Sequence, residues 1–260
     1  MWTLDALLAA HGWPVLIFAL AAMSAAGFSK GVVGFALPMI SVSLIGSVMP
    51  AQMAVAAMIL PGIVTNVWQT LRQGLGAAGR TLREYWRLNA VLFVMIALCA
   101  QLVTILSDRT LFLILGVGVT VFGVLQISGY GLPPTPRSRR GVVEPIVGIV
   151  SGFFGGLAGV WGPPIVLYLA SLGVDKQAMV RAQGVSYLIG SMILTGAHLR
   201  SGLLLGEGGT LSALMIVPAV AGMALGLAVQ DRLDPLVFRK VTLAVLILAG
   251  LNLLRRGLMG

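Results

Sequence analysis

Long apolar stretches separated by short polar segments run through most of the chain. Six of these stretches have the length of one membrane-crossing helix, about 20 residues. Such a stretch predicts a helix, because a helix bonds its own backbone groups internally where no water is present. The six stretches are Gln52–Leu71, Leu88–Leu106, Leu111–Tyr130, Met179–Leu199, Leu211–Val229 and Leu236–Leu254.

Two further apolar stretches are too long for one upright crossing. Trp13–Met49 has 37 residues and Pro145–Leu172 has 28. One helix over the first would measure about 55 Å, against a bilayer core of about 30 Å. Each stretch is interrupted near its middle, by GFSKGVVGFALP from Gly27 and by GGLAGVWGPP from Gly155. Because glycine and proline break helices, we expect breaks at Gly27, Pro38, Gly155, Pro163 and Pro164.

The second half of the chain repeats the order of elements in the first. In both halves a long interrupted stretch precedes three ordinary ones, and glycines of the two interruptions match at a spacing of 128 residues. We therefore expect one membrane repeat at residues 1–131 and a second at 144–260, joined by a basic, proline-rich linker at 132–143. The matched glycines are Gly27 with Gly155, Gly31 with Gly159, and Gly34 with Gly162.

Composition excludes a soluble protein. Hydrophobic residues make up 58% of the chain and charged residues 10%, whereas a soluble domain carries about 25% charged residues. The net charge of +9 does not indicate nucleic-acid binding, because the basic residues lie singly or in small groups between apolar stretches. The single cysteine, Cys99, excludes an intrachain disulfide or a cysteine metal site. The first stretch lacks the basic residues of a cleaved signal peptide.

The distribution of basic residues favours one topology. If all eight stretches cross fully, the basic residues of the loops and the tail divide 10 to 6 between the two sides, with Arg181, Arg239 and Lys240 counted in the loops that precede their stretches. If the two interrupted stretches are re-entrant hairpins, they divide 12 to 4, which fits the positive-inside rule better. The hairpin model makes the repeats inverted copies of each other, as in many transporters. It predicts a multi-pass protein of the inner membrane with both termini outside the cytoplasm.

Lys30 is the only lysine or arginine deep inside these stretches, because Arg181, Arg239 and Lys240 lie within the first five residues of theirs. A lysine at bilayer depth costs about 2.5–3.5 kcal/mol on insertion scales, so it indicates a functional partner. No acidic residue lies clearly inside a stretch to neutralise it, and Glu144 is expected at the end of one. An anionic substrate is the expected partner. The alternative is a lysine at an interfacial turn whose amine reaches water.

Unwound backbone at the two breaks predicts an anion site. Free N–H groups and the positive end of a helix dipole attract negative charge. The alternative is that these glycines only let helices pack closely. Besides Lys30, the expected binding residues at the breaks are Ser29, Gly31, Gly34, Gly159, Trp161 and Gly162.

A polar stripe follows one face of the Met179–Leu199 stretch. Its residues are three or four positions apart, so they share a helix face that must avoid lipid. We expect it to line the substrate path, with Gln183, Tyr187 and Asn66 in contact with substrate; hydrogen bonding between helices is an equally good interpretation. The stripe comprises Gln183, Tyr187, Ser191, Thr195 and His198, with Asn66 and Gln69 as a smaller counterpart on the Gln52–Leu71 stretch.

Enzyme chemistry is not indicated. The sequence has no H-E-x-x-H motif, no paired intramembrane aspartates and no Walker lysine loop. We therefore expect no catalytic residues, no metal site and no cofactor.

The sequence resembles the TauE/SafE family of membrane permeases, also called sulfite or organosulfonate exporters. The resemblance rests on GFSKGVVGFALP in the first half, and on SGFFGGLAGVWGPPIVLYL followed by KQAMVRAQGVSYL in the second. Where many members have adjacent glycines, this chain has Ser29, Lys30 and Gly31. The resemblance implies export of small sulfur-containing anions such as sulfite or a sulfonate.

Together these observations predict an all-α secondary transporter for small anions in the lipid bilayer. The central site would form where the two hairpin tips meet. An anion channel and a non-transporting membrane scaffold subunit are the alternatives. A homodimer is a possible assembly.

Overall fold

The computed structural model describes residues 4–71, 74–129, 133–230, 232 and 234–259, and within these ranges all regular structure is helical. The predicted stretch end Tyr130, the start of the predicted linker at Leu132, and Gly260 lie outside the described residues. The helices are α1 (Leu4–Val33), α2 (Leu37–Ile45), α3 (Ala51–Leu71), α4 (Leu75–Glu84), α5 (Trp86–Cys99), α6 (Leu102–Ile105), α7 (Asp108–Ile127), the short η1 (Arg137–Arg139), α8 (Arg140–Ala158), α9 (Gly162–Ser171), α10 (Lys176–Arg200), α11 (Glu207–Leu214), α12 (Ile216–Val229) and α13 (Pro235–Met259).

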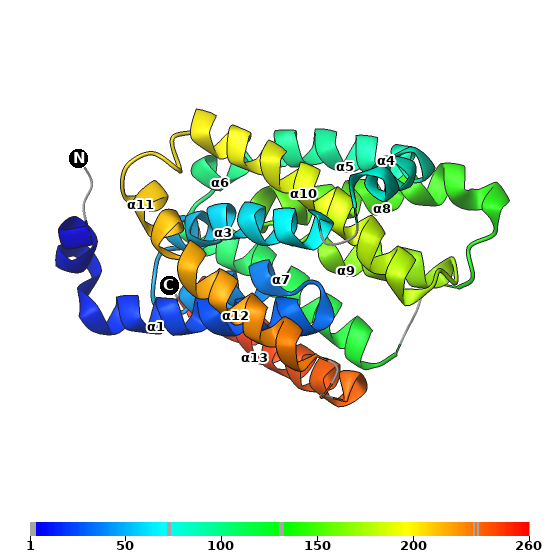
Figure 1. Ribbon diagram of the computed structural model, residues 1–260. Coiled ribbons are helices and arrows are strands. Elements are labelled where there is room, and N and C mark those ends of the chain that lie inside the picture. Colours follow the sequence, from blue (N-terminus) through cyan, green and yellow to red (C-terminus); the bar gives the residue numbers. More distant parts are fainter. Residues whose placement is uncertain (1–3, 72–73, 130–132, 231, 233, 260) are drawn as a thin grey trace.

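The predicted all-α, multi-pass membrane protein is confirmed. Among the described residues, seven helical segments are long and apolar enough to cross a membrane. They form one elongated bundle (Figure 1). α10 has 25 residues but is not one of the seven, and it carries the polar stripe that lowers its hydropathy. The seven segments are Leu4–Val33, Ala51–Leu71, Trp86–Ile105, Asp108–Ile127, Arg137–Ala158, Glu207–Val229 and Lys240–Met259.

The first interrupted stretch forms a hairpin of α1 and α2. The chain leaves α1 at Gly34, which has φ 85°, and Ala36 has φ 81° before α2 starts with Pro38 in its first turn. Positive φ suits glycine but is uncommon for alanine, so Ala36 holds local backbone strain. The far end of α2 lies close to the C-terminus, because the Arg256 guanidinium donates to the Met49 carbonyl oxygen at 3.0 Å.

The second interrupted stretch forms a hairpin of α8 and α9. The chain turns at Gly159, which has φ 66°, and Pro163 and Pro164 lie in the first turn of α9. The hairpin closes at its other end, where Thr135 N–H donates to the Ser171 carbonyl at 3.0 Å. In Figure 1 the start of α8 lies beside α4, at the end of the bundle opposite the N and C marks.

Gly27 and Gly155 are not helix breaks, which corrects the prediction. Gly27 lies inside α1 and Gly155 inside α8. A Cβ at Gly155 would lie 2.7 Å from the Trp161 ring, and a Cβ at Gly27 would clash with the backbone of Ala219. Both positions need glycine because another group packs directly on the helix. α8 also begins at Arg140, inside the range predicted as linker.

Close helix packing at glycines holds α1 against α12. A Cβ at Gly31 would lie 2.9 Å from the Gly226 Cα, and a Cβ at Gly222 would lie 2.9 Å from the Phe28 backbone nitrogen. Side chains of other residues at these positions would push the two helices apart. This is the small-residue packing that membrane helices use to approach each other.

A buried ionic cluster joins the two helices of the second hairpin. Glu144 in α8 is 1% exposed, and its Oε1 accepts hydrogen bonds from Arg140 Nε and from the Tyr168 hydroxyl of α9, both at 2.8 Å. Arg140 also donates to the Glu84 carbonyl oxygen at 3.1 Å. Glu144, expected at the end of an apolar stretch, is therefore an interior residue. Arg140, four residues earlier, supplies its counter-charge.

Candidate functional site

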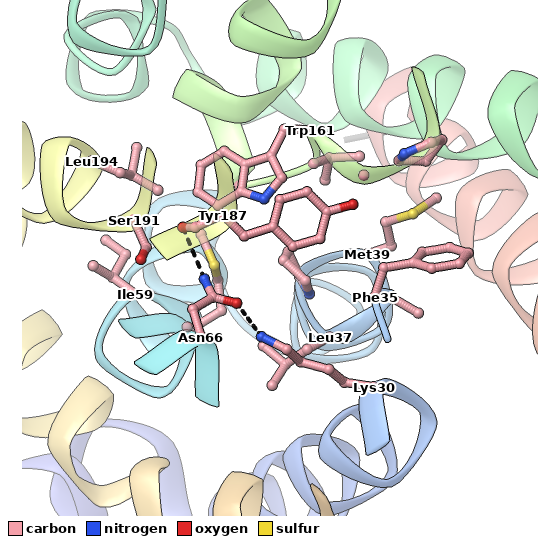
Figure 2. A pocket seen from close by; sticks show the side chains of 18 residues that line it. Lys30, Phe35, Leu37, Met39, Ile59, Asn66, Trp161, Tyr187, Ser191 and Leu194 are labelled. Atoms are coloured by element: carbon pink, nitrogen blue, oxygen red, sulfur yellow. Dashed lines mark hydrogen bonds between the residues drawn. The ribbon is translucent and has the colours of Figure 1, made fainter. Parts of the chain in front are cut away.

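The two hairpin tips meet in the interior of the bundle. A Cβ at Gly162 would lie 3.5 Å from the Phe35 Cβ, and one at Gly159 would lie 3.5 Å from the Pro38 Cβ. α3 and α10 complete the walls of a cavity between the tips (Figure 2). The cavity is lined by Lys30, Phe35, Ala36, Leu37, Pro38, Met39, Met58, Ile59, Gly62, Asn66, Gly159, Val160, Trp161, Gly162, Pro163, Tyr187, Ser191 and Leu194.

The cavity is small. Its volume of about 20 Å³ exceeds the minimum for one water molecule, about 10–15 Å³. An anion of four heavy atoms needs more room than one water. Such an anion enters only if the hairpin tips or their neighbours move apart.

Lys30 brings a positive charge to this cavity. The residue is 4% exposed and lies in the last turn of α1. Its amine donates to Thr65 Oγ1 at 2.9 Å and to Asn66 Oδ1. No salt bridge in the described part of the chain includes Lys30, and no acidic residue lines the cavity. The only bonded partners of the amine here are neutral oxygens.

Asn66 links Lys30 to α10. Its Oδ1 accepts from Lys30, and its Nδ2 donates to the Tyr187 carbonyl oxygen at 3.0 Å (Figure 2). Because both ends of the amide are used, its orientation is fixed by two different partners. A series of hydrogen bonds therefore connects the end of α1 to the middle of α10.

Two helix N-termini also open onto the cavity. α2 starts at Leu37 and α9 starts at Gly162, and both residues line it. The first turn of a helix has unbonded N–H groups and a partial positive charge, which together attract anions. Pro163 and Pro164 in α9 have no N–H group, so Gly162 is the donor available in the first three positions of that helix.

Several buried polar atoms near the cavity have no hydrogen-bond partner among the described residues. The Tyr187 hydroxyl and Gln183 Oε1 are in this group, as are both amide atoms of Gln69. A Cβ at Gly34 would lie 3.6 Å from Gln183 Oε1 and 3.9 Å from Gln69 Nε2, so these amides meet at the first break. Buried polar atoms normally have partners, so an unpaired group of them is typical of a site that binds a polar ligand.

The structure brings together part of the predicted site. Gly34 and Gln183 lie at its margin rather than in its wall, and Pro164 lies one residue beyond it. Ser29 is buried in α1 but does not line the cavity. Gly31 packs against α12 inside the helix, so it is not the exposed N–H donor that the sequence predicts. The predicted residues in the wall are Lys30, Pro38, Asn66, Gly159, Trp161, Gly162, Pro163 and Tyr187.

The polar stripe of α10 extends beyond the cavity. Tyr187 and Ser191 line it, whereas Thr195 bonds to the Ser191 carbonyl at 2.8 Å within the same helix. His198 is fully buried, and neither ring nitrogen has a partner among the described residues. Thr65, which precedes Asn66, is a site residue that the sequence pattern does not indicate, and its oxygen accepts from the same amine.

A buried lysine beside two helix interruptions, in a multi-pass helical chain, fits a membrane transport protein. The chain belongs to the sulfite exporter TauE/SafE family, whose family model matches residues 19–253. This confirms the resemblance seen in the sequence, and members of the family are transporters, not enzymes. No curated protein and no solved structure gives a significant match.

Proposed function

We propose that this protein is a secondary transporter for small anions, with sulfite or an organosulfonate as substrate. The observation that carries the proposal is Lys30, a buried amine with only neutral partners. A buried cation without a counter-charge is costly, and an anion in the adjoining cavity removes that cost. The description of the family, sulfite exporter, supports this class of substrate.

Each wall of the cavity has a role in this proposal. Lys30 supplies the charge, and Asn66 holds the amine in place. The first turns of α2 and α9 add N–H donors and partial positive charge. Trp161 and Tyr187, with ring centroids 6.1 Å apart, close one side and exclude water. Gln183 and Gly34 lie close enough to contact a ligand larger than the present cavity.

We further propose that the chain consists of two inverted repeats in the inner membrane, at residues 1–131 and from the start of α8 at Arg140 to residue 260. The hairpin of α1 and α2 opens at the end of the bundle that holds the termini, and the hairpin of α8 and α9 opens at the other. In the sequence, basic residues favour by 12 to 4 the loops that the hairpin arrangement places on the side of α4, with Arg181, Arg239 and Lys240 counted in the loops before their stretches. The positive-inside rule makes that side cytoplasmic. The possible homodimer stays a prediction from the sequence.

This topology has a direct test. A reporter fused after Gly260 should be active only outside the cytoplasm, whereas the same reporter inserted after Pro136 should be active only inside it. The two fusions control for each other, because both carry the same reporter and differ only in the side of the membrane on which it should lie. A cytoplasmic signal from the C-terminal fusion would contradict the proposed arrangement.

Flux measurements distinguish the transporter from its alternatives. In proteoliposomes of the purified protein, sulfite flux should saturate with concentration and respond to an imposed proton or sodium gradient. Flux that rises linearly with concentration would indicate the channel. No flux in pure liposomes, together with a stable partner on pull-down, would indicate the scaffold. The small volume of the cavity favours the transporter, because a channel needs a continuous open path.

A pair of glycines tests whether anions bind in the cavity. Gly62 is buried in α3 and lines the cavity, and a Cβ there meets nothing within 4 Å. Gly62→Ala should therefore leave the fold intact, or stabilise it by about 0.5–1 kcal/mol, because alanine favours helix. The new methyl group occupies space of the size of the cavity itself. Sulfite flux in proteoliposomes should fall at least tenfold, an effect of about 1.4 kcal/mol.

The matched control is Gly196→Ala in α10. Gly196 is helical and exposed, and a Cβ there also meets nothing within 4 Å. This variant should gain similar stability and keep full flux. Equal flux in the two variants would refute binding in the cavity.

A further inference from the structure

A second hollow lies at the end of the bundle that holds the termini. It has a volume of about 440 Å³ and lies between the start of α7 and the end of α13. Three arginines and one aspartate contribute to its wall, so its lining carries an excess of positive charge. The lining residues are Asp108, Arg109, Phe112, Arg255, Arg256 and Met259.

The positive charge of this hollow is not neutralised within the described chain. No salt bridge there includes Arg109, Arg255 or Arg256, although Asp108 lines the same space. Among the described residues, the lysines and arginines at this end of the bundle are these three and Arg200, the last residue of α10. Three of the four therefore converge at one place, at the end where basic residues are otherwise scarce.

One of the arginines is held in position. The Arg256 guanidinium lies 4.5 Å from the centroid of the Phe112 ring and donates to the Met49 carbonyl oxygen at 3.0 Å. Arg255 donates one hydrogen bond, to Asn252 Oδ1 at 3.0 Å, from an exposed position. A guanidinium has five N–H donors, so both arginines keep donors for a ligand. Arg109, in the first turn of α7, adds its charge to the positive end of that helix.

The surroundings of the hollow indicate the source of its ligand. Met259 in its wall is 81% exposed, and the neighbouring Leu258 is 67% exposed. Exposed apolar side chains beside arginines, at the end of a membrane-crossing bundle, are typical of the level of lipid headgroups. Guanidinium groups bind phosphate oxygens with paired hydrogen bonds. We propose that this hollow binds the phosphate group of an anionic phospholipid.

The test compares lipid binding by the purified protein and two variants. The arginines that do not support the fold are replaced in the double variant Arg109→Gln/Arg255→Gln, and Arg256 is left intact because it bonds to the Met49 carbonyl. The control is Arg200→Gln, which removes an exposed charge from the same end but outside the hollow. Native mass spectrometry and thermal shift measure binding of phosphatidylglycerol, phosphatidylcholine and inorganic phosphate at constant ionic strength.

We expect phosphatidylglycerol to bind the native protein more tightly than phosphatidylcholine. The double variant should bind phosphatidylglycerol about 25-fold more weakly, since each arginine near a membrane surface contributes about fivefold. Arg200→Gln should bind as the native protein does. If inorganic phosphate alone binds as tightly and is lost in the double variant, the phosphate site stands and its ligand is a free anion.

Two results would overturn the proposal. One is equal binding of the two lipids by the native protein. The other is equal loss of binding in the double variant and in Arg200→Gln, which would mean a general charge effect. Unchanged elution and thermal unfolding of the variants without lipid establish that they are folded. The site does not depend on the Lys30 cavity, so sulfite flux can fail while this test succeeds.

Discussion

Replacing Lys30 with methionine should abolish sulfite binding and flux while the protein still folds. Methionine keeps the length and much of the volume of the lysine side chain but has no charge. Truncating one partner of a buried charge-assisted contact costs about 2–5 kcal/mol. Binding should therefore weaken at least about 30-fold. Flux in proteoliposomes and thermal shift with sulfite measure the two effects.

Stability should change little in this variant. Thr65 Oγ1 and Asn66 Oδ1 each lose the hydrogen bond from Lys30. Each oxygen left without a partner lowers the stability by about 1–3 kcal/mol. Thr65 keeps its own bond to the Pro61 carbonyl at 2.7 Å. Removing a lysine from the membrane interior offsets the loss by about 2.5–3.5 kcal/mol. The control is Lys240→Met, an exposed lysine of α13, which should keep native flux. Undiminished sulfite uptake by the Lys30 variant would refute the proposed site.

The largest loss of stability is expected from Gly226→Leu. A Cβ at Gly226 would lie 3.0 Å from the Gly31 Cα and closer still to the Phe28 carbonyl oxygen. Both obstacles are backbone of α1, which moves only if the whole helix shifts. Overpacking usually costs about 1–3 kcal/mol, and with rigid backbone as the obstacle we expect about 3 kcal/mol or more. Equilibrium unfolding in mixed detergent micelles measures the change.

Two companion variants keep this prediction testable. Gly196→Leu places the same side chain in open space on α10 and should change stability by no more than about 0.5 kcal/mol. Gly226→Ala introduces only the Cβ, so its loss of stability should lie between those of the two leucine variants. If Gly226→Leu does not fold, the alanine variant still gives a measurable loss. Equal stability of the two leucine variants would show that α1 and α12 do not pack through these glycines.

Patterns along the chain predict the elements of the fold well, because lipid imposes them locally. A membrane-crossing helix needs a continuous apolar stretch, and the stretches that begin at Gln52 and Leu111 correspond to α3 and α7. The sequence does not predict α4, which is too short and too polar to cross. The sequence pattern also does not predict the interruption between α11 and α12. It follows from Pro218, which has no N–H to continue the helix from Leu214.

Which glycine breaks a helix depends on partners that a local pattern does not contain. Gly27 and Gly34 stand in one motif, yet Gly27 packs on Ala219 of α12 and only Gly34 has the positive φ of the break. In the second hairpin Gly155 likewise packs against another group, the Trp161 ring, and Gly159 has the positive φ of the break. Ala219, which contacts Gly27, is 192 positions away from it in the sequence. Spacing within a motif therefore finds both glycines but does not separate their functions.

The predicted charge at the site was easier to find than its partners. Lys30 stands out because a basic residue in an apolar stretch is costly wherever the chain folds. Thr65 is an ordinary residue of its helix, and only the packing of α3 beside the end of α1 places its oxygen at the amine. Glu144 shows the converse, since its carboxylate is buried but Arg140 already neutralises it.

In the proposed site, the link from Lys30 through Asn66 to the Tyr187 carbonyl makes anion capture an exchange rather than a simple addition. An arriving anion competes with the amide oxygen for the same ammonium hydrogens, so part of the attraction is spent on releasing an internal ligand. A neutral solute offers no advantage over that internal ligand and is rejected. When the anion leaves, the Asn66 amide oxygen accepts from Lys30 again. This competition lowers the affinity for the anion and speeds its release. The proposed transport cycle would therefore combine moderate affinity with rapid release.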